Sequence, residues 1–182
     1  RVLDVGIGNG QTALYLAANG IKAVGLDVDP RRVKKANFAA VARGFLQKKY
    51  SREHGKSLPV LTKRGKPLDV PVSFWYGKIE KVPQTVIERG PYDAVLLDGV
   101  LNRVRDLPAA IKSAESLAPR ILITIPDGGS IHTEHPKGTL RAFETYELEG
   151  MFVGRGRLVE SHQITDSLLC LEYTQGMEQY EP

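Results

Sequence analysis

The chain has one cysteine in 182 residues, so no disulfide can form within it. It also lacks any run of about 20 apolar residues, the length that a membrane-spanning helix requires. Its first residues resemble a core strand and show no signal-peptide pattern. These absences argue against a disulfide-stapled small domain and predict a cytoplasmic protein with no membrane partner.

Neither charge nor hydrophobicity is extreme, which argues against disorder. Hydrophobic residues make up 42% of the chain and charged residues 25%, with a net charge of +4. The length predicts one domain over residues 1–182 with a core of its own. Because the chain begins at the start of a predicted core strand, N-terminal residues are expected to be missing.

The positive charge is concentrated in one segment. Residues 43–71 hold eight basic and two acidic residues, a local charge of +6 that leaves −2 for the rest of the chain. Residues 48–71 are also rich in glycine and proline and are too long for an ordinary connection, so they are predicted to be a basic loop insertion. A solvated insertion is the favoured interpretation, and a nucleic-acid contact through Lys48–Lys66 is the next.

Apolar runs and helical periodicities alternate along the chain. Strands are predicted over residues 1–6, 22–27, 72–76, 92–97, 120–125, 156–163 and 167–174. Helices are predicted over residues 11–19, 31–47, 82–89, 107–117 and 140–151. The alternation predicts a doubly wound, Rossmann-like α/β domain. Its seven-stranded sheet is expected to be mostly parallel, with an antiparallel edge and helices on both faces.

A glycine-rich turn follows the first strand, in the segment Asp4-Val5-Gly6-Ile7-Gly8-Asn9-Gly10. Glycines let the backbone approach a ligand closely, and the next helix directs its N-terminal N–H groups at the same place. The segment from Gly8 to Ala13 also matches the dinucleotide pattern, so an NAD-binding oxidoreductase is an alternative. Asp4 favours a cationic ligand such as S-adenosylmethionine, which carries an ammonium and a sulfonium.

A second acidic residue ends the second predicted strand. Asp27 is placed to accept hydrogen bonds from ribose hydroxyls, which suits NAD and an adenosyl ligand equally. Asp29, directly before Pro30, is predicted to cap the next helix.

These motifs together resemble motifs I and II of the class I methyltransferases, which use S-adenosylmethionine. The segments Val2–Gly10 and Gly25–Pro30 carry most of the resemblance. Residues 92–104, 118–126 and 139–148 are similar to later blocks of that family. The likeness extends over nearly the whole chain except residues 48–71.

The resemblance implies a cofactor-binding set at the ends of the strands: Asp4, Gly6, Gly8, Asn9, Asp27, Val28, Lys78, Ile79, Asp98 and Gly99. Asp4 and the glycine turn would line the methionine and ribose side, and Asp27 would hold the ribose. Val28 and the turn at residues 76–79 would flank the adenine. Asp98 and Gly99 would lie near the methionine moiety and the reacting methyl.

The sequence departs from the family pattern at two places. Lys78 stands where an acidic residue usually meets the adenine amino group. Asn102-Arg103 replaces a Glu-His pair, so no histidine base is carried over.

The catalytic base, if one is needed, is therefore unassigned. Candidates are Asp127, His132 and His135, because they are expected near the carboxyl edge and histidine titrates near neutrality. The His132-Thr133-Glu134-His135 cluster is interpreted as a polar surface loop, and no metal is predicted.

The predicted function is methyl transfer from S-adenosylmethionine to a small-molecule acceptor. An RNA or protein methyltransferase that uses the basic insertion is an alternative, as are the NAD-binding oxidoreductase and a non-catalytic relative that binds the cofactor. Nothing in the sequence predicts the oligomeric state.

Overall fold

The computed structural model describes residues 1–45, 62–63, 66–67, 71–126, 156–165 and 168–175. Seven strands form one sheet in the order β5-β2-β1-β6-β7-β9-β8. Their bounds are Val72–Tyr76, Ala23–Asp27, Val2–Val5, Ala94–Asp98, Arg120–Pro126, Leu168–Gln175 and Gly156–Thr165, in that order. The predicted seven-stranded α/β sheet is thus confirmed.

The sheet is parallel from β5 to β7, and its last two strands are antiparallel. β1 pairs in parallel with β2 on one side and with β6 on the other. β9 pairs antiparallel with both β7 and β8, which confirms the predicted antiparallel edge. Since the chain proceeds from β1 toward β2 and later returns to β6, the strand order reverses between β1 and β6. Doubly wound sheets bind ligands outside the carboxyl ends of the strands at such a reversal.

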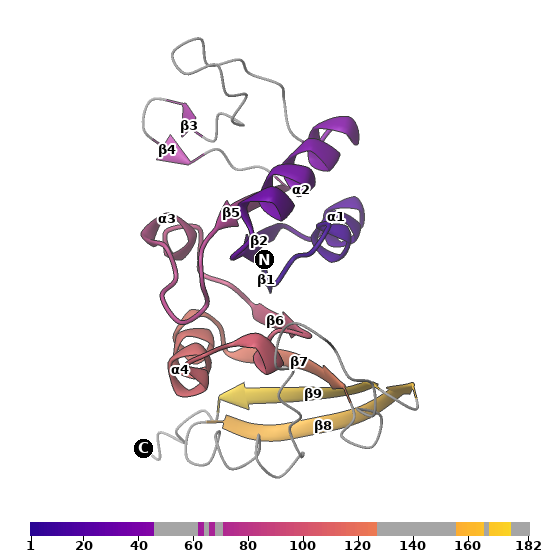
Figure 1. The fold of residues 1–182 in the computed structure, drawn as a ribbon, viewed down its shortest axis with the longest axis vertical. Helices are drawn as coiled ribbons and strands as arrows, with labels where there is room; N and C mark the ends of the chain where they lie inside the picture. Colours follow the sequence, from indigo (N-terminus) through magenta and orange to yellow (C-terminus); the bar gives the residue numbers. More distant parts are fainter. Residues whose placement is uncertain (46–61, 64–65, 68–70, 127–155, 166–167, 176–182) are drawn as a thin grey trace, which may run out of the picture.

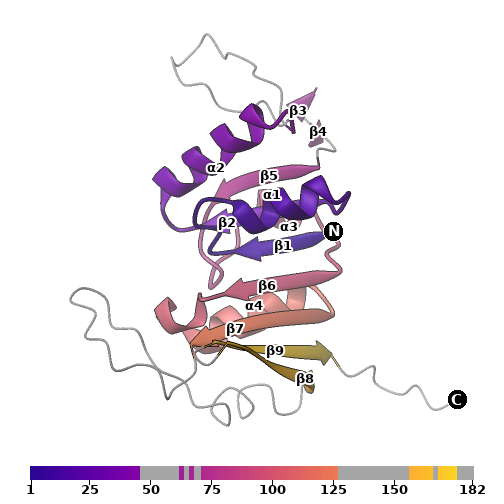
Figure 2. The same ribbon diagram turned by 90° about the vertical axis from the view of Figure 1, so that its right-hand side faces the viewer.

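Helices cover both faces of the sheet. α1 (Gln11–Ala18) and α2 (Pro30–Ala42) lie on one face, and α3 (Gln84–Ile87) and α4 (Leu107–Leu117) lie on the other (Figure 1). Figure 2 shows α1 in front of the sheet and α4 behind it, with the arrows of β6 and β7 pointing the same way. Each face has its own apolar cluster, and the cluster on the α3/α4 face is the larger.

The helix predicted over residues 31–47 ends earlier, at Ala42. Gly44 has a φ of 77°, its N–H donates to the Val41 carbonyl, and the N–H of Phe45 donates to the Ala40 carbonyl. This is the Schellman ending, in which a left-handed glycine terminates the helix and the next apolar residue packs back on it. Phe45 does pack against the α1/α2 cluster. Because Phe45 also fits the apolar periodicity of a helix, the predicted helix extended beyond its observed end.

Three further details differ from the sequence prediction. The helix expected over residues 82–89 has only one turn, at Gln84–Ile87, and Pro83 precedes it. A 3-10 turn, η1 (Leu101–Arg103), follows β6. Within the predicted loop, β3 (Thr62–Lys63) pairs with β4 (Lys66–Pro67). The helix predicted over residues 140–151 lies outside the described residues. No helix in the described ranges is long and apolar enough to span a bilayer.

Candidate functional site

Three aspartates lie at the carboxyl edge of three adjacent strands, on one face of the sheet. In the register of the sheet, Asp4 of β1 is opposite Gly25 of β2 and Leu96 of β6. Asp27 and Asp98 lie two residues further along those neighbouring strands, so all three carboxylates share a face because side chains alternate along a strand. This places them around the reversal between β1 and β6.

The turn after β1 brings backbone close to the end of β6. Gly6, Gly8 and Gly10 have φ values of 75°, 54° and 76°, a left-handed conformation that favours glycine. A Cβ on Gly6 would lie 2.4 Å from Cγ2 of Val100, which follows β6. The turn therefore requires glycine for its conformation and, at Gly6, for space. Asn9 lies exposed at the tip of the turn, ahead of α1.

Asp4 is buried beneath this turn with an incomplete set of hydrogen bonds. Its exposed fraction is 2%, and its Oδ2 has no hydrogen-bond partner among the described residues. Burial, and next the negative charge of Asp98, raise the pKa of Asp4 to about 7. A hydrogen bond from the backbone N–H of Ala13, in the first turn of α1, opposes this rise. An unsatisfied buried carboxyl oxygen is costly, so a cationic or donor group is favoured beside it.

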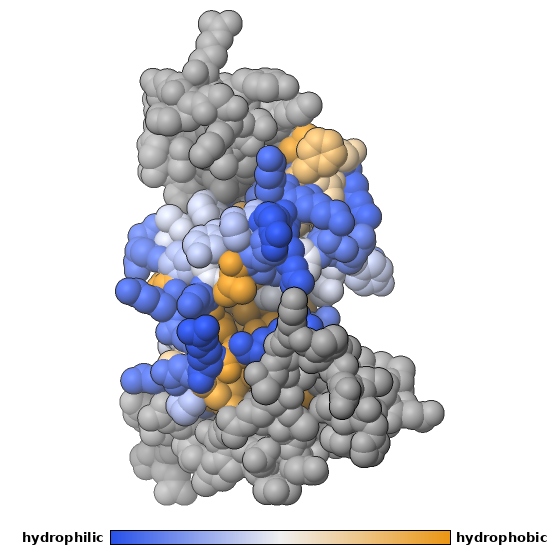
Figure 3. Space-filling view, in the orientation of Figure 1, coloured by the Kyte–Doolittle hydropathy of each residue, from blue (hydrophilic) through white to orange (hydrophobic). Residues whose placement is uncertain are grey.

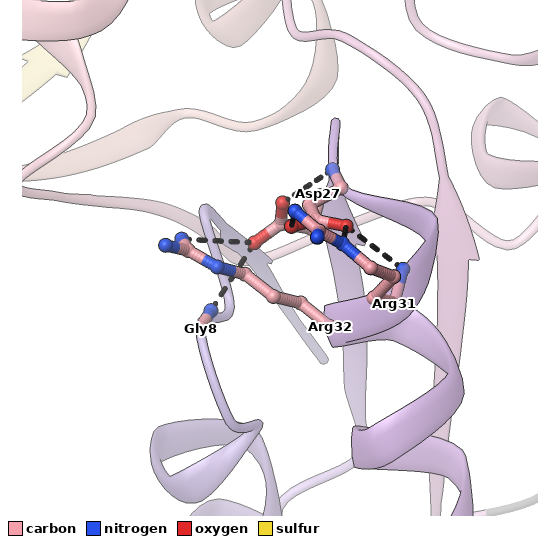
Figure 4. Close-up of polar contacts among 5 residues, drawn as sticks. Gly8, Asp27, Arg31 and Arg32 are labelled. Atoms are coloured by element: carbon pink, nitrogen blue, oxygen red, sulfur yellow. Dashed lines mark hydrogen bonds and ion pairs between the residues drawn. The ribbon is translucent and has the colours of Figure 1, made fainter. Parts of the chain in front are cut away.

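Asp27 is held by backbone N–H groups from both sides (Figure 4). Its Oδ2 accepts from the N–H of Gly8 at 3.2 Å, and its Oδ1 accepts from the N–H of Asp29 at 2.8 Å. The guanidinium of Arg32, from the first turn of α2, is 4.0 Å from Oδ2. A carboxylate has about four acceptor positions, so these contacts orient Asp27 and leave capacity for two ribose hydroxyls.

Asp29 caps α2, as the sequence predicted. Its Oδ1 accepts from the backbone N–H of Arg31 at 2.9 Å, and Pro30 follows it at the first helical position. Hydrogen bonds from Arg31 also hold the pKa of Asp29 below its usual value.

Asp98 and Gly99 are held by the neighbouring strand β7. The hydroxyl of Thr124 donates to Asp98 Oδ1, and the Gly99 N–H donates to that hydroxyl at 3.1 Å and to the Thr124 carbonyl at 3.2 Å. Gly99 has a φ of 59°. These bonds fix the end of β6 to β7, and the next residue, Val100, lies against Gly6 of the glycine turn.

The remaining predicted cofactor residues lie around the ends of β2 and β5. Val28 is 57% exposed, unusual for an apolar residue directly after a buried strand, and it suits the wall of a base-binding site. Lys78 is exposed, whereas Ile79 is buried in the core of the α3/α4 face. Only the backbone of Ile79 is therefore positioned to meet a ligand. Figure 3 shows this carboxyl-edge face, where a band of apolar surface lies between hydrophilic regions.

The candidate catalytic residues are not part of this assembly. Asp127, His132 and His135 lie outside the described residues, as does Glu134. Within the described ranges, no group of three His, Cys, Asp or Glu side chains could hold a metal ion. Asn102 is buried, and its Oδ1 has no hydrogen-bond partner in the described part of the chain, whereas Arg103 is exposed.

Sequence reasoning missed three residues that shape the site: Arg32, Val100 and Thr124. Thr124 had a usable signal, because it is a single hydroxyl in the apolar run Ile121-Leu122-Ile123-Thr124-Ile125. Arg32 and Val100 had none, since one is a surface charge in a helix and the other an apolar residue after a strand.

These residues fit S-adenosylmethionine on chemical grounds. The three carboxyl groups lie at an edge where backbone N–H groups and exposed apolar surface also meet, and Asp98 and Asp27 place negative charge beside Asp4. The orphaned Oδ2 of Asp4 suits a positively charged ligand, which the cofactor's ammonium and sulfonium provide. An anionic pyrophosphate would face repulsion from the same carboxylates.

Comparison with known proteins agrees with this chemistry. The family described as "Methyltransferase domain" matches residues 1–155. No curated protein gives a significant match.

Solved structures of other proteins share the fold of this chain. A magnesium protoporphyrin IX methyltransferase from Synechocystis PCC 6803, with bound SAH, is 16% identical; the match covers 96% of this chain and 74% of that one, with a TM-score of 0.68. A SAM-dependent methyltransferase from Aquifex aeolicus is 14% identical, with coverages of 96% and 81% and a TM-score of 0.68. The [4+2]-cyclase SpnF is 16% identical, with coverages of 97% and 74% and a TM-score of 0.69. At these identities the likeness establishes the fold alone.

The fold and the site thus define a Rossmann-like domain for an adenosyl ligand. Because the family match spans most of the chain, the protein belongs to the methyltransferase domain family. It is an S-adenosylmethionine-dependent methyltransferase, and the NAD-binding oxidoreductase alternative is set aside.

Proposed function

We propose that residues 1–182 form one catalytic domain that transfers a methyl group from S-adenosylmethionine to a small-molecule acceptor at the reversal between β1 and β6. The observation that carries the proposal is the cluster of Asp4, Asp27 and Asp98 around a glycine turn, with one buried carboxyl oxygen that has no hydrogen-bond partner among the described residues. Cationic methionine and neutral ribose groups both suit such a cluster.

Each described residue has a role in this proposal. Asp27 would accept the ribose hydroxyls, because its other contacts hold it in place. Asp4 and Asp98 would face the methionine moiety, and Gly6, Gly8, Asn9 and Gly99 would let backbone approach it. Val28, Lys78 and Ile79 would flank the adenine, with Val28 contributing its exposed side chain.

The bound cofactor supplies an electrophilic methyl group on a sulfonium. The chain's own residues have to bind both reactants, align them and exclude water from between them. Positioning of this kind suits rigid elements, and Asp98 and Gly99 are bonded to β7 through Thr124. Should the acceptor require a base, Asp127, His132 and His135 are the proposed candidates, since a histidine pKa lies near neutrality.

A small molecule is favoured as acceptor for two reasons. The Synechocystis protein with the same fold is a magnesium protoporphyrin IX methyltransferase. The described edge also presents a band of apolar surface, which suits the apolar part of a small acceptor (Figure 3). We place the domain in the cytoplasm because its single cysteine suits a reducing compartment.

A nucleic-acid acceptor is the second candidate, and one observation favours it. The segment 43–71 carries a local charge of +6, enough to contact several phosphates. Most of that segment lies outside the described residues.

Calorimetric titration tests the cofactor assignment. S-adenosylmethionine, S-adenosylhomocysteine and NAD would each be titrated into the wild-type chain and the Asp27→Ala variant. We expect micromolar binding of both adenosyl ligands, a loss of about 100-fold in Asp27→Ala, and no binding of NAD. Binding of NAD alone would overturn the proposal.

A matched control tests whether the loss of affinity is specific to Asp27. Asp29→Ala removes a neighbouring carboxylate that accepts hydrogen bonds from the Arg31 side chain, and the backbone N–H of residue 29 that donates to Asp27 remains. It should bind the adenosyl ligands as the wild type does. Transfer of labelled methyl groups to a small-molecule panel and to total RNA would then decide between the acceptor classes.

A further inference from the structure

In the free protein, the surroundings of Asp4 disfavour the ionised form of its carboxyl group. Asp4 is 2% exposed, receives a backbone hydrogen bond from Ala13, and has no partner for Oδ2 among the described residues. A buried carboxylate needs two or three donors or a nearby cation to remain ionised at little cost. Asp27, by comparison, receives two backbone N–H groups.

Negative charges on the neighbouring strands increase the cost of ionising Asp4. β6 contributes Asp98, the second-largest cause of the shift after burial, and β2 contributes Asp27. α1 contributes only the N–H of Ala13 and the partial positive charge of its N-terminus. On α2, Arg32 is directed at Asp27, at 4.0 Å from its Oδ2. No full positive charge among these groups is paired with Asp4.

We propose that Asp4 holds a proton in the free protein and releases it to solvent when the cationic end of S-adenosylmethionine binds beside it. This inference rests on the proposed function, because it needs the methionine moiety near β1. The exchange keeps the buried charge balanced. A proton leaves Oδ of Asp4 as an ammonium or sulfonium arrives, so neither an isolated carboxylate nor an uncompensated cation remains in the site.

The direction of the pH dependence follows from linkage. Binding that releases a proton becomes weaker as the pH falls, because protonation of Asp4 competes with the ligand. The pKa of Asp4 in the free chain is about 7. Affinity should therefore rise by about fivefold from pH 6 to pH 7. The ligand's own amino group keeps its charge over the lower interval, since α-amino groups titrate near pH 8.

Calorimetry in buffers of different ionisation enthalpy measures the released proton directly. Titrations of S-adenosylmethionine into the full chain would be run at pH 6 and pH 7, in phosphate and in imidazole. We expect a release approaching one proton at pH 6 and about half a proton at pH 7. A release near zero at both pH values, with normal binding, would overturn the inference and leave the proposed function intact.

A ligand without the cation separates the inference from the function. 5′-Methylthioadenosine has the adenosyl group but neither the ammonium nor the sulfonium. It should bind with no proton release and with an affinity that is flat between pH 6 and pH 7. Failure of both ligands to bind would contradict the proposed function itself. Equal proton release with both ligands would show that Asp4 does not sense the cation.

Two variants assign the proton to a residue. Asp4→Asn keeps the shape and removes the titration, so proton release and the fivefold pH effect should disappear. Asp98→Asn removes the strongest neighbouring charge and should lower the proton release at pH 7. If Asp4→Asn releases as many protons as the wild type, another group titrates and the inference is wrong. The wild-type comparison of the two ligands stands even if a variant fails to fold.

Discussion

The two faces of the sheet differ although the same strands build them. Toward α3 and α4, strands β1, β2, β6 and β7 present large aliphatic side chains: Leu3, Val5, Val24, Leu26, Val95, Leu97, Ile121, Ile123 and Ile125. On the opposite face the same four strands present Asp4, Gly25, Asp27, Asp98 and Thr124. Strand alternation thus places the larger apolar cluster on one face, and the carboxylates beside the smaller cluster on the other.

Small residues make the second face usable as a site. A Cβ on Gly25, beside Asp4, would lie 2.4 Å from Phe74 Cδ1 and 2.7 Å from Ile7 Cγ2. The aromatic ring occupies the space that a side chain at position 25 would need. Stability should therefore depend mainly on the aliphatic face, and cofactor affinity on the carboxylate face.

The largest expected effect on stability is from Leu97→Ala on the aliphatic face. Leu97 is fully buried, so the truncation leaves a cavity and should lower the free energy of unfolding by about 3–5 kcal/mol. Urea unfolding followed by circular dichroism measures this loss. Cofactor affinity, measured where the variant is still folded, should stay within about twofold. A parallel loss of affinity would mean that the two faces are not separable.

Asp4→Asn tests the opposite face and should increase the stability of the free protein at high pH. The pKa of Asp4 is about 7 in the folded protein, against 3.8 for an ordinary aspartate side chain, so the unfolded chain binds fewer protons between these values. Stability from this group is therefore lost as the pH rises from about 4 to 7, by as much as about 4 kcal/mol. The variant should lack this loss.

Thermal unfolding of both proteins between pH 4 and pH 8 checks the sign. The advantage of the variant should be largest at pH 8 and shrink toward pH 4. A variant that is less stable than the wild type at pH 8 would show that the ionised carboxylate stabilises the fold.

Thr124→Val should have a smaller effect on both properties. It removes the hydroxyl that receives the Gly99 N–H and donates to Asp98. We expect a loss of about 1–2 kcal/mol in unfolding free energy and a several-fold weaker affinity for S-adenosylmethionine. Thr124→Ser keeps the hydroxyl and should preserve the affinity. If Thr124→Val bound S-adenosylmethionine as tightly as the wild type, β7 would have no role in cofactor binding.

Asp29→Ala should have the smallest effect. It removes the cap of α2 and its bonds to Arg31, and should lower Tm by a few degrees. Differential scanning calorimetry would measure that shift. A fall in Tm comparable to that of Leu97→Ala would contradict the assignment of stability to the aliphatic face.

Local patterns predicted the parts of the molecule that depend on neighbouring residues. The turn from Asp4 to Gly10, the Asp29 cap and the helix over residues 107–117 are of this kind, and the structure has each of them. The early end of α2 was missed although Gly44 signalled it, because Phe45 continued the apolar periodicity.

Features that depend on residues far apart in the sequence could not be predicted from local patterns. The register that brings Asp4 and Asp98 to one face joins strands about 90 residues apart, and only the family resemblance suggested their proximity. The contacts of Thr124 with Gly99 and of Val100 with Gly6 depend on the same long-range strand pairing. The roles of the site residues in binding stay predictions until the titrations are made.

The position of β9 between β7 and β8 has a consequence for how the chain folds. Among the described strands, β8 pairs only with β9, so it has no partner strand in the sheet until β9 is in place. The two strands are separated by only residues 166–167, and their pairing is the most local in the sheet. We therefore expect them to form as a hairpin and to add to β7 as one cooperative unit, after the slower parallel pairing of β1, β2, β6 and β7. In native-state hydrogen exchange, the amides of β8 and β9 should open together, at a lower free energy than those of β1.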